Sequence, residues 1–93
     1  MLKLNYKAIK ALMGMPYDYA DDVIIPIIDD TAFFLLSAGV KKEIVERPLS
    51  YGCIATGAKD TYNFESGNIK YSPLFYLKII QLAGMDSLPE DLR

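Results

Sequence analysis

Histidine is absent from this 93-residue sequence, and cysteine occurs only once, at Cys53. Without histidine, the chain lacks the commonest general base and the commonest metal ligand in proteins. A single cysteine cannot form an intramolecular disulfide, so the sequence does not indicate a secreted disulfide scaffold, and a reducing compartment is expected. Cys53 stands among small residues without a histidine partner, which favours a packing role over a nucleophilic one.

A surplus of basic residues is also lacking. The 10 lysines and arginines stand against 12 aspartates and glutamates, which gives a formal net charge of −2. Such a chain releases few counterions from a phosphate backbone, so autonomous nucleic-acid binding is not expected.

Long uninterrupted apolar runs are missing as well. The most apolar region, residues 23–40, is broken by Pro26 and by the pair Asp29-Asp30. It falls short of the roughly 20 consecutive apolar residues that span a bilayer. Residues 1–7 lack the apolar stretch and the cleavage site of a signal peptide. We therefore expect a soluble intracellular protein that makes no membrane contact.

The sequence does contain enough apolar material for one small domain. Hydrophobic residues make up 52% and charged residues 24% of the chain, with 5 prolines and 6 glycines, which excludes disordered and collagen-like classes. A chain of this length is expected to bury roughly 64% of its unfolded surface. We predict one domain over residues 1–84, followed by a mobile acidic tail over residues 85–93.

Two helices are predicted in the first half of the chain. Gly14 and the Met15-Pro16 pair end the first. Its apolar face is expected to hold Leu4, Ala8, Ala11 and Leu12, with Lys3, Lys7 and Lys10 facing elsewhere. A second helix is predicted over about residues 22–38, with Asp21 and Asp22 capping its free amides and Gly39 ending it. Pro26 lies close enough to the start to be tolerated in the first turn, or else it kinks the helix.

The second half of the chain predicts two more helices. Residues 41–47 form either a loop or a short helical turn, and Pro48 opens a third helix that reaches about Tyr62. Gly52 and Gly57 in this segment are expected to allow close helix approach. A turn cluster covers residues 63–68, and Ser72-Pro73 then starts a last helix that ends at Gly84. The fold class is a small all-α domain of four helices, with the long apolar second helix at its centre.

The second helix is apolar around most of its circumference. Its polar residues, among them Asp22, Asp29 and Asp30, gather within an arc of roughly 100°. A helix of this kind is buried nearly all round, either by the three other helices or by a second subunit, since large exposed patches usually mark interfaces. If a second subunit contributes, the interface residues are predicted to be Val23, Ile24, Ile27, Ile28, Phe33 and Phe34.

No enzyme chemistry is evident in the sequence. The densest group of carboxylates runs from Asp18 to Asp30, but no histidine, paired cysteines or calcium-loop spacing accompanies it. Helix capping and solvated charge account for these residues. The seven tyrosines favour half-buried core positions or a protein interface over base stacking, because no cationic groove accompanies them. We expect no catalytic residue, no metal site and no cofactor.

The order of elements resembles the small all-α head–tail connector proteins of tailed phages. In the front half, the acidic start at Asp18 and Asp21-Asp22 leads through an apolar helix to Gly39-Val40. In the back half, a helix opened by Pro48-Leu49 reaches Lys59 and Tyr62, an Asn/Gly-rich break follows, and a final helix carries Tyr76, Ile79, Ile80 and Leu82. The resemblance covers about residues 5–83 and departs from the family at Pro26 and at the small residues Gly52, Gly57 and Ala58.

The resemblance implies a non-enzymatic virion protein. Members of this family form a ring of about a dozen copies beneath the portal protein, extend the DNA channel and bind a stopper or tail-completion protein. DNA passes through such a ring without sequence-specific binding. The implied location is the head–tail junction of the virion, with assembly in the host bacterial cytoplasm. Portal-facing positions in the tail would be Met85, Leu88 and Leu92.

Two other classes of protein stay open. The first is a small helical regulatory or protein-binding module, which could be a dimer through the second helix. The second is a helix-turn-helix DNA-binding repressor, which is disfavoured because no helix is rich in arginine and lysine. The nearest basic groups are the pair Lys41-Lys42 and the spaced Lys7 and Lys10.

Overall fold

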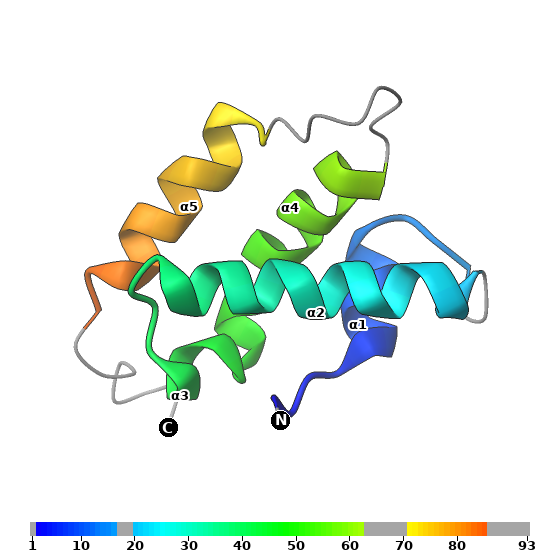
Figure 1. The fold of residues 1–93 in the computed structure, drawn as a ribbon, viewed down its shortest axis with the longest axis horizontal. Helices are drawn as coiled ribbons and strands as arrows, with labels where there is room; N and C mark the ends of the chain where they lie inside the picture. The colour runs from blue at the N-terminus through cyan, green and yellow to red at the C-terminus, as the bar shows by residue number, and fades with distance from the viewer. Residues whose placement is uncertain (1, 17–19, 63–70, 86–93) are drawn as a thin grey trace.

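The regular structure of this chain is helical throughout the residues described by the computed structural model, which are 2–16, 20–62 and 71–85. The elements, in chain order, are α1 (Tyr6–Leu12), α2 (Asp21–Ser37), α3 (Lys42–Val45), the 3-10 turn η1 (Pro48–Ser50), α4 (Tyr51–Tyr62) and α5 (Pro73–Ala83) (Figure 1). The all-α prediction is confirmed. The four predicted helices are present, and α3 is the short helical turn left open for residues 41–47.

The central element is α4, which packs against α1, α2 and α5. Figure 1 shows α2, the longest helix, running across α4, with α5 at one end of α2 and α1 towards the other. Sequence analysis placed the second helix at the centre. The structure gives that place to α4, because its small residues let neighbouring helices approach on several sides.

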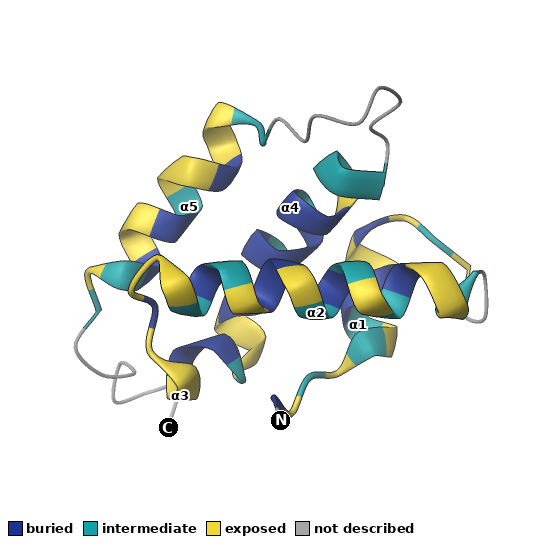
Figure 2. Ribbon diagram, in the orientation of Figure 1, coloured by how far each residue is buried: buried dark blue, intermediate teal, exposed yellow. Residues whose placement is uncertain are grey.

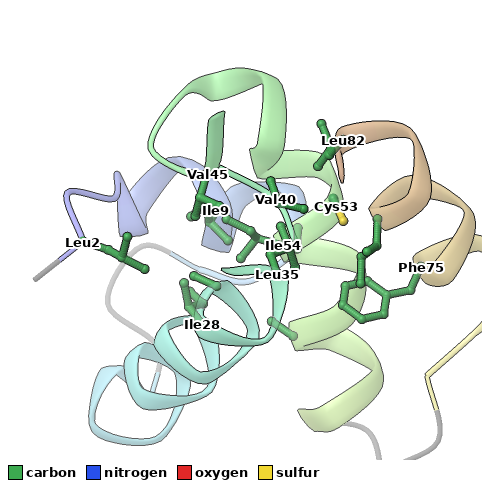
Figure 3. Packing of buried hydrophobic residues seen from close by; sticks show 14 of the residues in the cluster. Leu2, Ile9, Ile28, Leu35, Val40, Val45, Cys53, Ile54, Phe75 and Leu82 are labelled. Carbon is green, nitrogen blue, oxygen red and sulfur yellow. The ribbon is translucent and has the colours of Figure 1, made fainter. Parts of the chain in front are cut away.

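The core lies between α4 and the three helices that pack against it, α1, α2 and α5, and α3 adds Ile44 and Val45 to it. Figure 3 shows its side chains converging from all of these helices, and Figure 2 shows that each helix turns one buried face inward. Gly57 of α4 is essential to this packing, since a Cβ atom there would lie 2.6 Å from Cζ of Phe75 and 2.8 Å from Cγ2 of Thr31. The fully buried apolar side chains are Ile9, Ile24, Ile28, Ala32, Leu35, Ile44, Val45, Ile54, Ala58 and Phe75.

Glycines end α1 and α2 in the same way. Gly39 has φ +101°, a left-handed conformation that glycine adopts without strain, and its N–H bonds to the carbonyl of Leu36 at 3.1 Å. The N–H of Val40 reaches the carbonyl of Leu35 at 3.0 Å, which completes a Schellman motif. Gly14, with φ +79°, closes α1 in the same manner. The two predicted helix ends are therefore confirmed.

The predicted face of the first helix is wrong. Lys10 is buried, at 2% exposure, whereas Leu12 is 60% exposed. The residues that turn inward are Ile9, Lys10 and Met13, because the ammonium of Lys10 forms an ion pair with the carboxylate of Asp21 at the start of α2. An ion pair between two helices lets a lysine occupy a position that its charge alone would place at the surface.

The start of α2 also differs from expectation. Its N-cap residue is Ala20, with φ +50° and no side-chain capping bond, so Asp21 and Asp22 lie in the first turn instead of capping the free amides. There their negative charges still interact favourably with the positive end of the helix dipole. Pro26 lies beyond the first turn, on the exposed side of α2. Because proline has no N–H, the carbonyl of Asp22 receives no helical hydrogen bond, and water can reach it on this side.

Candidate interaction surfaces

The outward side of α2 carries a mixed acidic and apolar surface. Its exposed residues recur every three or four positions, which places them on one helix face. We call this surface the α2 stripe. It consists of Asp22, Val23, Pro26, Asp30, Phe33 and Ser37.

The residues predicted for a subunit interface differ in how far they are buried. Ile24 and Ile28 are fully buried within the chain, so they cannot contact another subunit. Val23 and Phe33 belong to the α2 stripe, where they are 47% and 54% exposed, and Ile27 is half-buried against the core. A contact made by α2 with a second subunit would therefore use Val23 and Phe33. The sixth residue, Phe34, has a different role.

Phe34 joins α2 to α5 through an aromatic cluster. Its ring centroid lies 5.9 Å from that of Phe75 and 5.2 Å from that of Tyr71. Tyr71 and Phe75 are themselves 4.4 Å apart, and Tyr76 approaches both rings at 6.0 Å. These separations are typical of favourable aromatic pairs. Tyr71 is thus one of the half-buried core tyrosines expected from the sequence, as are Tyr6, Tyr51 and Tyr62.

A second apolar surface covers the outer side of α5. It lies opposite the buried residues Phe75, Ile79 and Leu82, and we call it the α5 face. This surface was not predicted from the sequence. The signal was present, since Lys78 is the one charged residue in the eleven positions of this helix. The α5 face consists of Leu74, Tyr76, Leu77 and Ile80.

A groove runs along α4 on its open side. It has a volume of about 380 Å³, and it shares the lining residues Gly52 and Lys78 with a second hollow of about 200 Å³ that Leu49 and Gln81 border. Its walls come from three helices, namely the end of α1, α4 and α5. We call it the α4 groove, and its lining residues are Leu12, Gly52, Ala55, Thr56, Lys59, Asp60 and Lys78.

The two glycines of α4 have different roles. Gly57 allows a close helix approach, as expected, because Phe75 and Thr31 fill the space beside it. Gly52 does not, because a Cβ there would meet only the ammonium of Lys78, at 3.5 Å. Gly52 has no side chain and instead forms part of the floor of the α4 groove.

Two polar pairs fix α1 to α2. One is the ion pair between Lys10 and Asp21. In the other, the hydroxyl of Tyr6 donates a hydrogen bond of 2.5 Å to Oδ1 of Asp29. Burial, and then this bond to a carboxylate, raise the pKa of Tyr6 to about 12. Asp21 and Asp29, which the sequence left as capping or solvated charge, thus hold two helices together.

Cys53 lies in the core beside the groove. It is buried, and burial raises the pKa of its thiol to about 11, although the nearby charge of Lys78 lowers it in part. A thiol with a raised pKa is a poor nucleophile at neutral pH, in keeping with the packing role predicted from the sequence.

Three residues near the end of the chain were predicted to face a portal protein. Met85 is half-buried and packs against the core, whereas Leu88 and Leu92 lie outside the described residues.

Within the described ranges, no group of three or more acidic or cysteine side chains could hold a metal ion. No helix in the same ranges is long and apolar enough to cross a membrane.

Comparison with known proteins adds no family to this description. No family model, no curated protein and no solved structure matches the chain.

Proposed function

We propose that this chain is a non-enzymatic structural subunit of a tailed-phage head–tail connector. In this role, copies form a closed ring that joins the portal protein to a stopper or tail-completion protein and extends the DNA channel. The site of action would be the head–tail junction of the virion, after assembly in the host cytoplasm. The proposal starts from the resemblance in the order and spacing of elements and draws on the surfaces described above.

The observation that carries the proposal is the exposure of large apolar side chains on separate faces. Val23 and Phe33 are exposed on α2, and Ile80, at 68% exposure, is the most exposed member of the α5 face. A small domain that remains a monomer rarely leaves several apolar surfaces open. A ring subunit needs two surfaces for its neighbours and more for proteins above and below, so exposed faces on different helices suit it.

The charge of the chain is compatible with a DNA channel. Its formal net charge is −2. A channel through which DNA slides must not bind the phosphate backbone, and a cationic wall would do so through counterion release. An acidic subunit avoids that binding, and DNA would pass without sequence-specific contacts.

The α5 face favours a second candidate, a small helical protein-binding module that could be dimeric. Leu74, Tyr76, Leu77 and Ile80 form an apolar surface on a single helix, and one such surface is enough for a partner helix or a two-fold dimer. The two candidates differ in how many surfaces must be covered. A dimer through the α5 face leaves the α2 stripe open, whereas a ring covers faces on both sides of each copy.

Light scattering across a wide range of protein concentrations tests the proposal. The connector account predicts a species of about a dozen subunits, and the fraction of the protein in this species should rise with concentration. A tight dimer at every concentration would contradict the ring and favour the binding module. A chain that stays monomeric would show that the isolated subunit does not close a ring, and assembly on a purified portal would then be measured.

A further inference from the structure

The α2 stripe and the α4 groove lie on opposite sides of the domain. Ile24, Ile28 and Leu35 turn the inner side of α2 to the core, and the α2 stripe occupies the reverse side. On α4, Gly57 contacts Thr31 of α2. At about 100° per residue, Gly57 lies roughly 140° around the helix from the middle of the groove. The stripe therefore faces outward from one side of the molecule and the groove opens on the other.

The two surfaces carry opposite charges. The α2 stripe holds Asp22 and Asp30 and no basic residue, and the two are about 12 Å apart along the helix. The α4 groove holds Lys59 and Lys78. It also holds Asp60, which accepts a hydrogen bond of 2.9 Å at Oδ2 from the N–H of Ser72 and keeps its negative charge, so the formal charge of the groove lining is +1 against −2 for the stripe. The groove therefore offers two ammonium groups to an acidic partner.

The shapes and apolar residues of the two surfaces also fit. The floor of the groove is made of the small residues Gly52, Ala55 and Thr56, which let a helix approach α4 closely. Leu12, on its rim, is exposed by 60%, although it is a large apolar residue. The α2 stripe supplies apolar side chains of matching kind at Val23 and Phe33. A helix seated in the groove would cover apolar surface on both partners.

We propose that the α2 stripe of one copy packs into the α4 groove of a second copy, so that successive copies associate front to back. This inference rests on the proposed ring function and names the two surfaces that would build the ring. The acidic residues Asp22 and Asp30 of one copy lie against Lys59 and Lys78 of the next. Because the two surfaces differ and face opposite ways, each copy uses both, and the interface is heterologous. The α5 face stays uncovered and available to a different protein.

Charge reversal on each surface tests the interface. The full chain is compared with Asp30→Lys and Lys59→Glu, two substitutions at exposed positions, by sedimentation velocity at low ionic strength. Each single variant should raise the concentration needed for half-assembly about tenfold or more, because each places like charges across the interface. Circular dichroism and thermal melting of the monomers establish that both variants are folded.

Mixing the two variants gives the decisive result. The Asp30→Lys stripe is complementary to the Lys59→Glu groove, and the unchanged stripe and groove of the two variants also match. An equimolar mixture should therefore assemble within about threefold of the original concentration, as should a chain that carries both substitutions. Glu43→Lys and Lys42→Glu, which change the net charge equally at exposed positions of α3, should leave assembly unchanged.

Two results would overturn this inference. If the original chain assembles and the stripe and groove variants assemble as the α3 controls do, the interface is elsewhere, while the proposed ring function stands. If the original chain stays monomeric up to millimolar concentration, front-to-back association does not occur, and the ring function is then judged by assembly on a portal. Loss in the single variants without recovery in the mixture would also contradict the pairing of these two surfaces.

Discussion

At the scale of single residues, Gly57 is the described glycine with the least space beside it. The ring of Phe75 and the methyl of Thr31 occupy the space that a side chain would need, so α5 and α2 both approach α4 at this position. Gly57→Ala should lower the free energy of unfolding by about 1–3 kcal/mol, because the added methyl group overpacks the core. Urea denaturation monitored by circular dichroism measures the change.

Gly52 provides the matched control for that prediction. It lies in the same helix, but a Cβ there would meet only the end of the flexible Lys78 side chain. Gly52→Ala should therefore stabilise the monomer by up to about 1 kcal/mol, the gain in helix propensity from glycine to alanine. Equal losses of stability in the two variants would contradict the packing described around Gly57.

Tyr6 gives the chain a pH-dependent contribution to stability. Its pKa is about 12 in the folded protein against 10.0 for an ordinary tyrosine, so the folded state favours the neutral phenol. The contribution is fully present below pH 10 and is lost as the pH rises towards 12. Tyr6→Phe removes the bond to Asp29 and should cost about 1 kcal/mol near neutral pH.

The same variant isolates that pH dependence. The difference in unfolding free energy between the original chain and Tyr6→Phe should shrink as the pH is raised from about 8 to about 11, because the hydroxyl titrates in only one of the two proteins. Urea denaturation at the two pH values measures it. A difference that is constant over this range would show that Tyr6 is not held neutral by its surroundings.

At the scale of elements, the ends of α1 and α2 and the start of α5 follow from local chemistry, whereas the start of α2 at Ala20 does not. Ser72 and Pro73 predicted the start of α5, and Oγ of Ser72 accepts a hydrogen bond from the N–H of Phe75 at 3.3 Å. Ser72→Ala should destabilise the protein by about 1 kcal/mol, since it leaves a helix amide without its cap. Thermal denaturation checks the loss, with Ser37→Ala, at an exposed position near the end of α2, as the comparison. Similar effects of the two substitutions would contradict the capping role.

Helix faces were harder to predict than helix ends. The last turn of α1 was assigned from apolar spacing, but Lys10 turns inward to meet Asp21 and Leu12 turns outward to the groove. The ion pair joins residues of two helices, so the spacing of residues within α1 does not predict it. The short apolar segment of α1 offered several consistent faces, and only contact with α2 and α4 selects among them.

At the scale of the whole molecule, the surfaces that carry the proposals differ in how far the sequence predicts them. The α2 stripe follows from one helix, and two of its members, Val23 and Phe33, were among the predicted interface residues. The α4 groove is assembled from α1, α4 and α5, so its lining residues are distant along the chain. Such a site depends on the packing of helices, and local patterns do not reveal it. The resemblance to connector proteins suggests the proposed function but does not indicate which surfaces of the chain would carry it.

Assembly should depend on ionic strength. The proposed contact places Asp22 and Asp30 against Lys59 and Lys78, and salt screens charges near a surface over about 8–10 Å at ordinary concentrations. Raising the salt from about 0.05 M to about 0.5 M should shift assembly to higher protein concentration, and light scattering measures the shift. Assembly that strengthens steadily with salt would indicate an interface dominated by apolar contacts, such as the α5 face.

Electron microscopy of the concentrated chain tests the central claim most directly, because it shows whether copies of this subunit close on themselves. The account predicts closed rings of one copy number with an open centre, formed by the original chain and lost in Asp30→Lys. Paired particles with two-fold symmetry at every concentration would contradict the connector account and favour the protein-binding module.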